Sequence, residues 1–430
     1  MSLLRYEGAL AAMPDDVRLA IVRRSAGDVA KALEAVAPLA RDVRARGDEA
    51  LRAITKRFDG VDLARFEVPR ADVEAALARV DPAFGAALEA AARNIRVFHE
   101  AQRRPDLEVE VAPGVRAGRR YVPLAKVGCY APGGRAAYPS TVLMTVLPAK
   151  VAGVGEIVLA TPPRADGAIP DATLAAAAVA GADRVFALGG AQAVFALAYG
   201  TASVPRVDKI VGPGNAYVAA AKALVAGEVA IDAPAGPSEV LVVADATADA
   251  DAVAWDLLAQ AEHDPAASAV LVATDAPLLA RARTALERAL ATTPRAAIAR
   301  EALAARGALL LARDLDEAVA FAEAFAPEHL SIQTAAPRAV LARLRTYGSA
   351  FLGPYSPVAF GDYASGPNHV LPTAGLARSF SGLSVDDFLR RPTHQEVDRE
   401  GFRTLAPTVA TLARAEGLHA HAASVEARRP

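Results

Sequence analysis

The sequence predicts an α/β protein with two lobes, each built on a parallel β-sheet, and with small helical segments at both ends. Beyond Tyr121, short apolar runs alternate with helical stretches of about ten to fifteen residues, which is typical of β–α–β units. The alternation stops at residues 233–238, where prolines and a glycine break regular structure, and then begins again. A chain of 430 residues is long enough for two such lobes with a cleft between them.

The part of the chain before these runs is expected to be helical. Residues 1–26 form a small N-terminal segment. Between residues 18 and 99 apolar residues recur every three or four positions, as in 28–36 and 71–79. This spacing predicts surface helices that pack on a larger body.

The first run of β–α–β units predicts strands at 126–131, 156–161, 184–188 and 209–212, with helices at 141–154, 171–180 and 215–226. The second run predicts strands at 239–244, 268–273, 308–312, 329–333 and 349–353. We expect 27–129 and 237–383 to form one lobe and 130–236 the other. The repetition of the pattern suggests an internal duplication.

The end of the chain, 384–430, is expected to form a helical, charged arm, with no strand after Asp387. It has too little apolar surface to fold alone, so we expect it to pack on another lobe or another subunit.

Charge and composition exclude several classes of function. The chain has 47 Lys and Arg residues against 49 Asp and Glu residues, so no basic excess is available to bind a nucleic acid. Charged residues precede any long apolar run at the N-terminus, so no signal peptide is expected. Glycines and polar residues interrupt the longest uncharged run, 185–205, and no membrane span is expected there. We therefore expect a cytoplasmic protein.

The chain has one cysteine, Cys129, which excludes an internal disulfide and a cysteine-rich metal cluster. A metal site would have to use imidazole, carboxylate and amide ligands. Gln260 and His263 have the spacing that puts two side chains on one face near the end of a helix. Taken alone, this pair is better explained as a helix end with a histidine near its C-terminal dipole.

Two further segments carry polar groups beside predicted strands. Glu328 and His329 stand where a helix ends and a strand begins, and a carboxylate next to an imidazole can act as a general base. Because adjacent residues of an extended segment point in different directions, we expect the two groups to serve different steps. The loop 361–369 contains Asp362 and His369 and follows a strand, which favours a binding loop.

The glycine-rich turns do not match a dinucleotide fingerprint. Residues 212–217 lie between a strand and a helix, where backbone amides bind anions, but Tyr217 stands where the fingerprint has its third glycine. Both lobes are therefore expected to be Rossmann-like without the usual fingerprint. Ser238 is not a nucleophile elbow, because Val240 replaces the closing glycine.

Taken together, these segments resemble the histidinol dehydrogenase family, the enzymes of the last two oxidations in histidine biosynthesis. The resemblance covers almost the whole chain, and its motifs occur in one order. The matching segments are 128–134, 138–144, 207–216, 234–241, 260–263, 327–331 and 361–373.

This resemblance implies a set of zinc, substrate and NAD residues. One zinc ion per subunit would be bound by Gln260, His263, Asp362 and His421, the last supplied by the arm of the partner in a swapped homodimer. His421 matches the family spacing in the tail, whereas His419 does not. Histidinol would contact these four residues and also Ser238, His329, His369 and Glu416. NAD would contact Tyr130, Gln192 and Asn215.

The implied reaction converts L-histidinol and two NAD⁺ through histidinaldehyde to L-histidine and two NADH. His329 is expected to remove the hydroxyl proton in the first oxidation, and Glu328 to activate water for the second. In the family, zinc holds the imidazole and amine of the substrate and so positions the reacting carbon.

Three alternatives remain open from the residues. A thiol route to the acid would need Cys129, which is expected to be buried in a strand. A zinc hydrolase could use the same ligands and Glu328, without NAD. A two-lobed protein that closes on an amine ligand would need neither Glu328 nor His329 for affinity.

Overall fold

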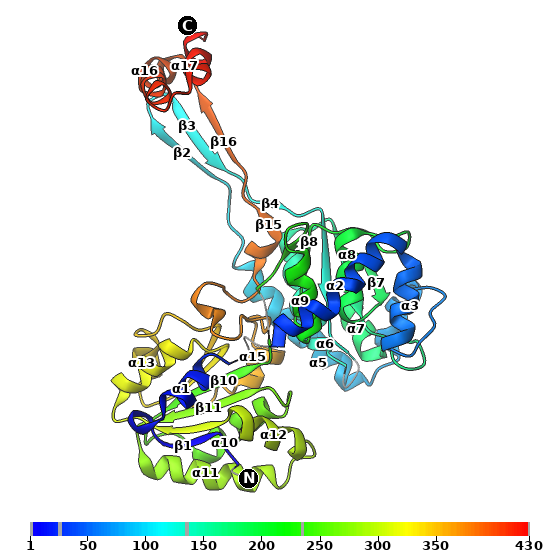
Figure 1. Ribbon diagram of the computed structural model, residues 1–430, viewed down its shortest axis with the longest axis vertical. Helices are drawn as coiled ribbons and strands as arrows, with labels where there is room; N and C mark the ends of the chain where they lie inside the picture. Colours follow the sequence, from blue (N-terminus) through cyan, green and yellow to red (C-terminus); the bar gives the residue numbers. More distant parts are fainter. Residues whose placement is uncertain (1–2, 25–27, 134–136, 234–235, 429–430) are drawn as a thin grey trace.

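The computed structural model describes residues 3–24, 28–133, 137–233 and 236–428. Two lobes, each with a parallel sheet, lie side by side, and a long projection leads away from them to the C-terminus (Figure 1). We call this projection the stalk and define it as residues 107–123 and 389–428. The N-terminus lies at the opposite end of the molecule (Figure 1).

The first sheet, sheet A, has six parallel strands. Its order is β1 (Tyr6–Ala9), β12 (Ala308–Leu311), β11 (Ser268–Ala273), β10 (Glu239–Ala244), β13 (His329–Gln333) and β14 (Ser349–Leu352). The five strands predicted in the second run are all present. The edge strand β1 lies in the segment that was expected to be helical. It is short, and its residues alternate between half-buried and exposed, so it lacks the continuous apolar run that predicts the central strands.

Helices cover both faces of sheet A because the side chains of each strand point alternately to the two faces. In β10, Val240 and Val242 face one helical layer and Leu241 and Val243 face the other. The first layer consists of α10 (Ala250–Ala261), α11 (Ala276–Leu290) and α12 (Ala296–Arg306). The second consists of α1 (Asp15–Val22), α13 (Leu315–Phe325) and α14 (Pro337–Leu341). The short helix α15 (Val358–Tyr363) follows β14.

The second sheet, sheet B, has five parallel strands. Its order is β7 (Arg184–Ala187), β6 (Glu156–Thr161), β5 (Lys126–Tyr130), β8 (Lys209–Val211) and β9 (Ala230–Ile231). One face is covered by α4 (Arg70–Ala75), α5 (Pro82–Glu100), α6 (Pro139–Ala152) and α7 (Asp171–Ala180). The other is covered by α2 (Asp28–Arg46), α3 (Asp48–Phe58), α8 (Gly190–Tyr199) and α9 (Ala216–Val225).

This packing divides the chain differently from the expected boundaries. The helices between residues 28 and 100 pack on sheet B, and β5 is the central strand of sheet B. The expected division grouped 27–129 with 237–383, the part of the chain that supplies most of sheet A. The reason is that the amphipathic helices show an apolar face but not which sheet that face covers.

The two lobes share one strand order. Numbered along the chain within each run, both sheets read 3-2-1-4-5, with β1 added at the edge of sheet A. This is the order of a Rossmann-like half, and it agrees with the predicted repetition. In such a sheet the order in which strands are added reverses beside the first strand. This point lies between β5 and β8 in sheet B and between β10 and β13 in sheet A.

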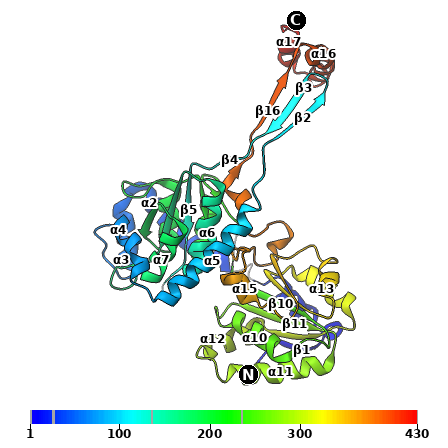
Figure 2. The same ribbon diagram turned by 180° about the vertical axis from the view of Figure 1, so that it is seen from behind.

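The stalk corrects the expectation that no strand follows Asp387. It contains a three-stranded antiparallel sheet of β2 (Leu107–Ala112), β3 (Val115–Arg119) and β16 (Thr393–Val397), and β4 (Val122–Pro123) pairs with β15 (Leu389–Arg390). Its far end carries α16 (Arg399–Ala415) and α17 (His419–Glu426) (Figure 2). All residues of β16 are exposed, so no apolar period marks it in the sequence.

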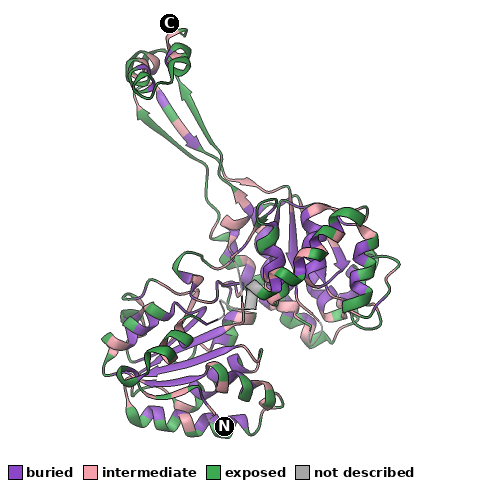
Figure 3. Cartoon of the chain, viewed as in Figure 1, coloured by how far each residue is buried: buried purple, intermediate pink, exposed green. Residues whose placement is uncertain are grey.

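Much of the stalk is exposed in the single chain (Figure 3). Its buried cluster contains three alanines, Ala410, Ala413 and Ala422. Short 3₁₀ helices lie elsewhere at Leu10–Ala12, Ala76–Ala78, Leu376–Arg378 and Val385–Phe388. Within the described ranges, no helix has both the length and the apolar character needed to cross a membrane.

Candidate active site

Glu328 and His329 lie at the amino end of β13, beside the amino end of β10, where Ser238 and Glu239 lie. Helix α13 ends at Phe325, and the chain turns into β13 through Ala326, whose φ of 48° is left-handed and rare for a residue with a side chain. The turn brings Glu328 to the position just before the strand begins. The sequence identified this pair but could not show at which end of the sheet it lies.

The side chains of Glu328 and His329 lie close together rather than pointing apart. An oxygen of Glu328, Oε2, is 3.5 Å from Nδ1 of His329. The expectation of divergent directions was wrong, because Glu328 precedes the strand and the alternation of a strand does not apply to it. Both side chains are almost completely buried.

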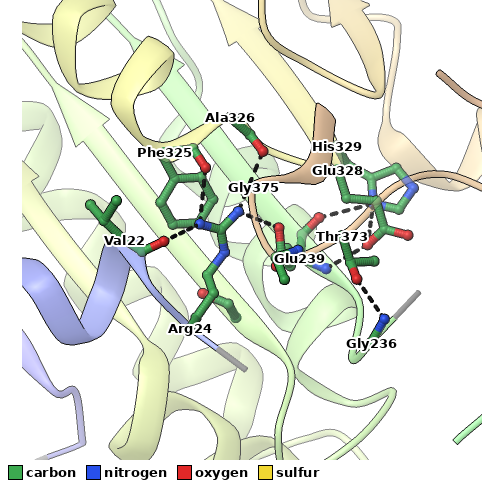
Figure 4. Close-up of polar contacts among 12 residues, drawn as sticks. Val22, Arg24, Gly236, Glu239, Phe325, Ala326, Glu328, His329, Thr373 and Gly375 are labelled. Carbon is green, nitrogen blue, oxygen red and sulfur yellow. Dashed lines mark hydrogen bonds and ion pairs between the residues drawn. The ribbon is translucent and has the colours of Figure 1, made fainter. Parts of the chain in front are cut away.

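The backbone of Glu239 fixes both groups (Figure 4). Its N–H donates to Oε2 of Glu328 at 2.7 Å. Its carbonyl lies 2.9 Å from Nδ1 of His329. Because a carbonyl only accepts, Nδ1 carries the proton, and in the neutral ring Nε2 holds the free lone pair.

Nε2 of His329 faces Asp362, the last but one residue of α15. It lies 3.6 Å from Oδ1 of Asp362, and among the described residues it is a buried nitrogen without a hydrogen-bond partner. Burial lowers the pKa of His329, but the carboxylates of Glu328 and Asp362 outweigh this and raise it to about 9. Burial raises the pKa of Glu328 to about 8. Both shifts favour the protonated forms, so each group has to give up its proton before it can act as a base.

His369 is connected to the same group of side chains. Its Nδ1 donates to the backbone carbonyl of Asp362 at 2.8 Å, and its Nε2 lies 3.2 Å from the hydroxyl of Thr141 on α6. Burial raises the pKa of Asp362, but the imidazoles of His329, His369 and His263 hold it below its usual value. The loop 361–369 thus joins residues of sheet A to the first turn of α6 in the other lobe.

The candidate metal ligands of the body are Gln260, His263 and Asp362. Gln260 is buried near the end of α10 and His263 follows that helix, as the sequence predicts. Nε2 of Gln260 is a second buried nitrogen without a partner among the described residues. In the part of the chain that the structure describes, no group of three or more His, Cys, Asp and Glu residues has the geometry of a metal site.

The three side chains nevertheless have the chemistry of zinc ligands, one short of a four-coordinate site. An amide, an imidazole and a carboxylate supply oxygen and nitrogen donors, which zinc accepts. A group of three His, Cys, Asp and Glu residues could include only His263 and Asp362, because Gln260 is an amide. A further ligand from outside the body would complete a four-coordinate site.

Ser238 is half-buried directly before β10. The segment before it is joined to the loop that follows residue 369, because the N–H of Gly236 donates to the hydroxyl of Thr373 at 2.5 Å. Residues 234 and 235, in the predicted break between the two runs of β–α–β units, lie outside the described residues. Ser238 and Glu239 therefore stand where the chain passes from sheet B to sheet A.

The three residues expected to contact NAD lie at or just beyond the carboxyl ends of strands of sheet B. The hydroxyl of Tyr130, the last residue of β5, accepts from the N–H of Gly190 at 3.0 Å. Gln192 is buried in the first turn of α8, after β7. Asn215 follows β8, and its side-chain oxygen caps α9 by accepting from Tyr217 and Val218, which leaves its NH₂ group available to donate.

The two sheets therefore present different ends to the site. In sheet B the residues follow strands, as the rule for open α/β sheets expects. In sheet A, Ser238, Glu328 and His329 stand at the amino ends of β10 and β13. Ser238, Glu328 and His329 in sheet A, and Tyr130 and Asn215 in sheet B, adjoin the pair of strands at which the strand order reverses, whereas Gln192 follows the edge strand β7.

Glu416 and His421 are not brought to these residues within one chain. Glu416 caps the end of α16, and His421 lies in α17, at the far end of the stalk (Figures 1 and 2). Both are exposed.

Several residues of this region were missed by the sequence analysis. Glu239 binds both catalytic candidates, and the side chain of Arg24 forms an ion pair with it at 2.5 Å. Asp59, at the end of α3, accepts from Nε2 of Gln192 at 3.1 Å, and burial raises the pKa of Asp59. A charged residue at the start of an otherwise apolar strand was a signal for Glu239. Arg24 and Asp59 are remote in the sequence from the groups that they contact.

Comparison with known proteins identifies one family over almost the whole chain. The family model described as histidinol dehydrogenase matches residues 22–429. The histidinol dehydrogenase of Methanothermobacter thermautotrophicus is 52% identical over 408 residues, which is 95% of this chain and 96% of that protein. The histidinol dehydrogenase of Natronomonas pharaonis is 52% identical over 421 residues, 98% of this chain and 99% of that protein.

A solved structure agrees with the sequence relatives. The crystal structure of histidinol dehydrogenase from Elizabethkingia anophelis superimposes with a TM-score of 0.93 at 37% identity. The match covers 100% of this chain and 98% of that one.

Proposed function

The chain belongs to the histidinol dehydrogenase family, and on this premise we propose that it catalyses the zinc-dependent, NAD-linked oxidation of L-histidinol through L-histidinaldehyde to L-histidine. It is an oxidoreductase of histidine biosynthesis that acts on histidinol. The observation that carries the finer proposal is Nε2 of His329, which has no hydrogen-bond partner among the described residues and is buried opposite Asp362, with Glu328 beside the same ring.

The first oxidation needs a base for the hydroxyl proton of histidinol. Nε2 of His329 is the candidate, because Nδ1 is occupied by the carbonyl of Glu239. When the proton moves to Nε2, the carbonyl bond of the aldehyde forms as the carbon gives up a hydride. The negative charge of Asp362 stabilises the imidazolium that results.

The second oxidation needs water to add to the aldehyde. The Glu328 carboxylate would take a proton from that water, and the hydrate then loses a hydride and a proton to give the acid. The N–H of Glu239 orients one oxygen of this carboxylate. NAD⁺ would accept the hydride in both oxidations, with Tyr130, Gln192 and Asn215 as the proposed contacts.

We propose Gln260, His263, Asp362 and the partner's His421 as zinc ligands, and Ser238, His369 and Glu416 as further substrate contacts. When bound, zinc would hold the imidazole and amine of histidinol and so position the reacting carbon. Gln260 would bind the ion through its amide oxygen, and its Nε2, which has no hydrogen-bond partner among the described residues, would then be left to donate to the substrate or a neighbouring group.

We propose a homodimer in which each stalk completes the site of its partner. The stalk exposes large apolar side chains that one chain leaves uncovered, namely Leu107, Val109, Val111, Val397, Val409, Leu412 and Leu418. An open groove of about 540 Å³ runs along its strands. The same proposal places the enzyme in the cytoplasm, which agrees with a single free cysteine.

The test is the amount of NADH formed for each L-histidinol consumed, measured by absorbance before chelation, after chelation and after zinc is restored. Two NADH per histidinol, lost on chelation and recovered with zinc, are expected. No NADH from histidinol with zinc present would contradict the proposed reaction.

A further inference from the structure

Glu239 makes polar contacts with both of its main-chain groups and with its side chain. Its N–H and C=O bind the side chains of Glu328 and His329. Its carboxylate has two partners of its own: Oε1 accepts from the N–H of Ala374 at 2.7 Å, and Oε2 accepts from Arg24 at 2.5 Å. The orientation of both catalytic candidates therefore depends on where this one residue is held.

Arg24 holds the other side of the site as well (Figure 4). Its guanidinium donates to the carbonyl of Phe325 at 2.9 Å and to the carbonyl of Val22 at 3.0 Å, and it lies 3.4 Å from the centre of the Phe325 ring. It also lies 3.4 Å from the carbonyl of Ala326, the left-handed residue two positions before Glu328. The side chain of Arg24 thus connects the start of β10 to the turn that precedes Glu328 and His329.

Stability alone is a weak reason for such a pair. The side chains of Arg24 and Glu239 are 1% and 2% exposed, so both charges have lost their water. The desolvation of a buried ion pair commonly cancels its attraction, and apolar residues of similar size are often as stable. A buried pair in contact with the catalytic residues points to a role in their orientation.

We propose that Arg24 and Glu239 are positioning residues that fix the Glu328 carboxylate and the His329 imidazole for both oxidations. The inference rests on the proposed function, because it takes Glu328 and His329 as the catalytic pair. It predicts a larger effect on turnover than on substrate binding. Of the proposed histidinol contacts, Ser238 and His329 adjoin Glu239, whereas the zinc ligands Gln260, His263 and Asp362 lie outside the Arg24–Glu239 contacts.

The experiment compares the zinc-loaded parent enzyme with Arg24→Met, Arg24→Lys, Glu239→Gln and the double variant Arg24→Met with Glu239→Gln. Steady-state kinetics with L-histidinol and NAD⁺ give kcat and KM, and thermal unfolding gives the stability of each protein. In Arg24→Met we expect kcat to fall about tenfold or more and KM to change by less than about twofold. Lysine keeps the charge but not the forked contacts, so Arg24→Lys should lie between the two.

The double variant separates orientation from stability. It contains neither buried charge, and the new amide can still accept from Ala374, so its unfolding temperature should return most of the way to that of the parent. The proposal requires kcat to remain low in this stable protein. If kcat recovers together with stability, or if Arg24→Met turns over within about twofold of the parent, the pair is merely structural and the proposal is overturned. Should Arg24→Met fail to fold, the same criterion applies to the double variant.

Two controls complete the design. Arg184→Met removes an ion pair with Glu67 at the outer edge of sheet B and should lower stability without changing kcat. The proton on Nδ1 of His329, observed by ¹⁵N-edited NMR, should exchange slowly with solvent in the parent and faster in Arg24→Met. This exchange measurement does not depend on catalytic activity. If the parent fails to oxidise histidinol, the proposed function fails, whereas unchanged exchange in the variants overturns the positioning role.

Discussion

The backbone carbonyl of Glu239 lies 2.9 Å from Nδ1 of His329, across the paired amino ends of β10 and β13. A main-chain acceptor fixes the tautomer of the imidazole whatever the side chain of residue 239 is. The nitrogen that faces Asp362 is therefore the one that takes up a proton. The predictions below follow from this arrangement and from the burial of neighbouring groups.

Glu328→Gln should separate the two oxidations. Glutamine keeps the contact with the N–H of Glu239 but cannot take a proton from water. We expect oxidation of histidinaldehyde to fall about 10²–10⁴-fold, with a much smaller effect on oxidation of histidinol to the aldehyde. Stopped-flow measurement of NADH from each substrate checks this. Equal losses in both steps would contradict the separate role of Glu328.

Cys129→Ala should retain both oxidations. Cys129 lies fully buried in β5, and burial raises the pKa of its thiol to about 12, so the thiolate needed for a thioester route does not form at neutral pH. The measurement is NADH formed per histidinol, with two expected from the variant as from the parent. A variant that forms only one NADH per histidinol would establish the thiol route.

Mixing two variants that are each inactive in the oxidation of histidinaldehyde should restore that oxidation if the stalk completes the partner's site. Glu328→Gln supplies an intact His421, and His421→Ala supplies an intact Glu328. In random dimers about half are mixed and each has one intact site, so about a quarter of the parental rate of histidinaldehyde oxidation is expected after the variants are unfolded and refolded together. Each variant refolded alone is the control. No recovery in a mixture that sediments as a dimer would contradict the shared site.

Asp256→Asn should stabilise the protein at neutral pH. Burial raises the pKa of Asp256 in α10 to about 6 from an unfolded value of 3.8, so the folded state binds its proton more tightly than the unfolded state does. The stability that this group contributes is complete below about pH 4 and is lost as the pH rises through 6. Thermal unfolding should show the variant about 2 °C or more above the parent at pH 7.5, and no such gain near pH 4.

A matched control for Asp256→Asn is Glu301→Gln, which removes an exposed carboxylate from α12 of the same lobe. It should leave the pH dependence of stability unchanged. A gain for Asp256→Asn that is equal at both pH values would show that the charge of Asp256 is not its cause.

The parts of the fold that could be predicted from sequence are those in which burial dictates composition. The strand 239–244 is completely buried, and after Glu239 it is a continuous apolar run that can be recognised in the sequence. The strand 393–397 is exposed on both faces and pairs with 115–119, which is far away in the sequence, so nothing in its own residues reveals it.

The same reasoning separates the site residues. Gln260, Glu328 and His329 lie in short motifs at the ends of helices or strands, and the spacing of apolar residues predicts those helices and strands. Arg24 contacts Glu239 but is separated from it by 215 positions in the sequence, and no local sequence pattern connects the two residues. Contacts of this kind become visible only when the chain is folded.

The stalk also determines how the molecule is assembled. Its sheet joins β3 to β16, which are separated by nearly the whole of both lobes, so a growing chain must finish both lobes before this sheet can close. The long interval slows that step relative to the lobes, which form from neighbouring segments. If dimerisation follows, recovery of activity after denaturation should depend on protein concentration and lag behind the return of helical structure.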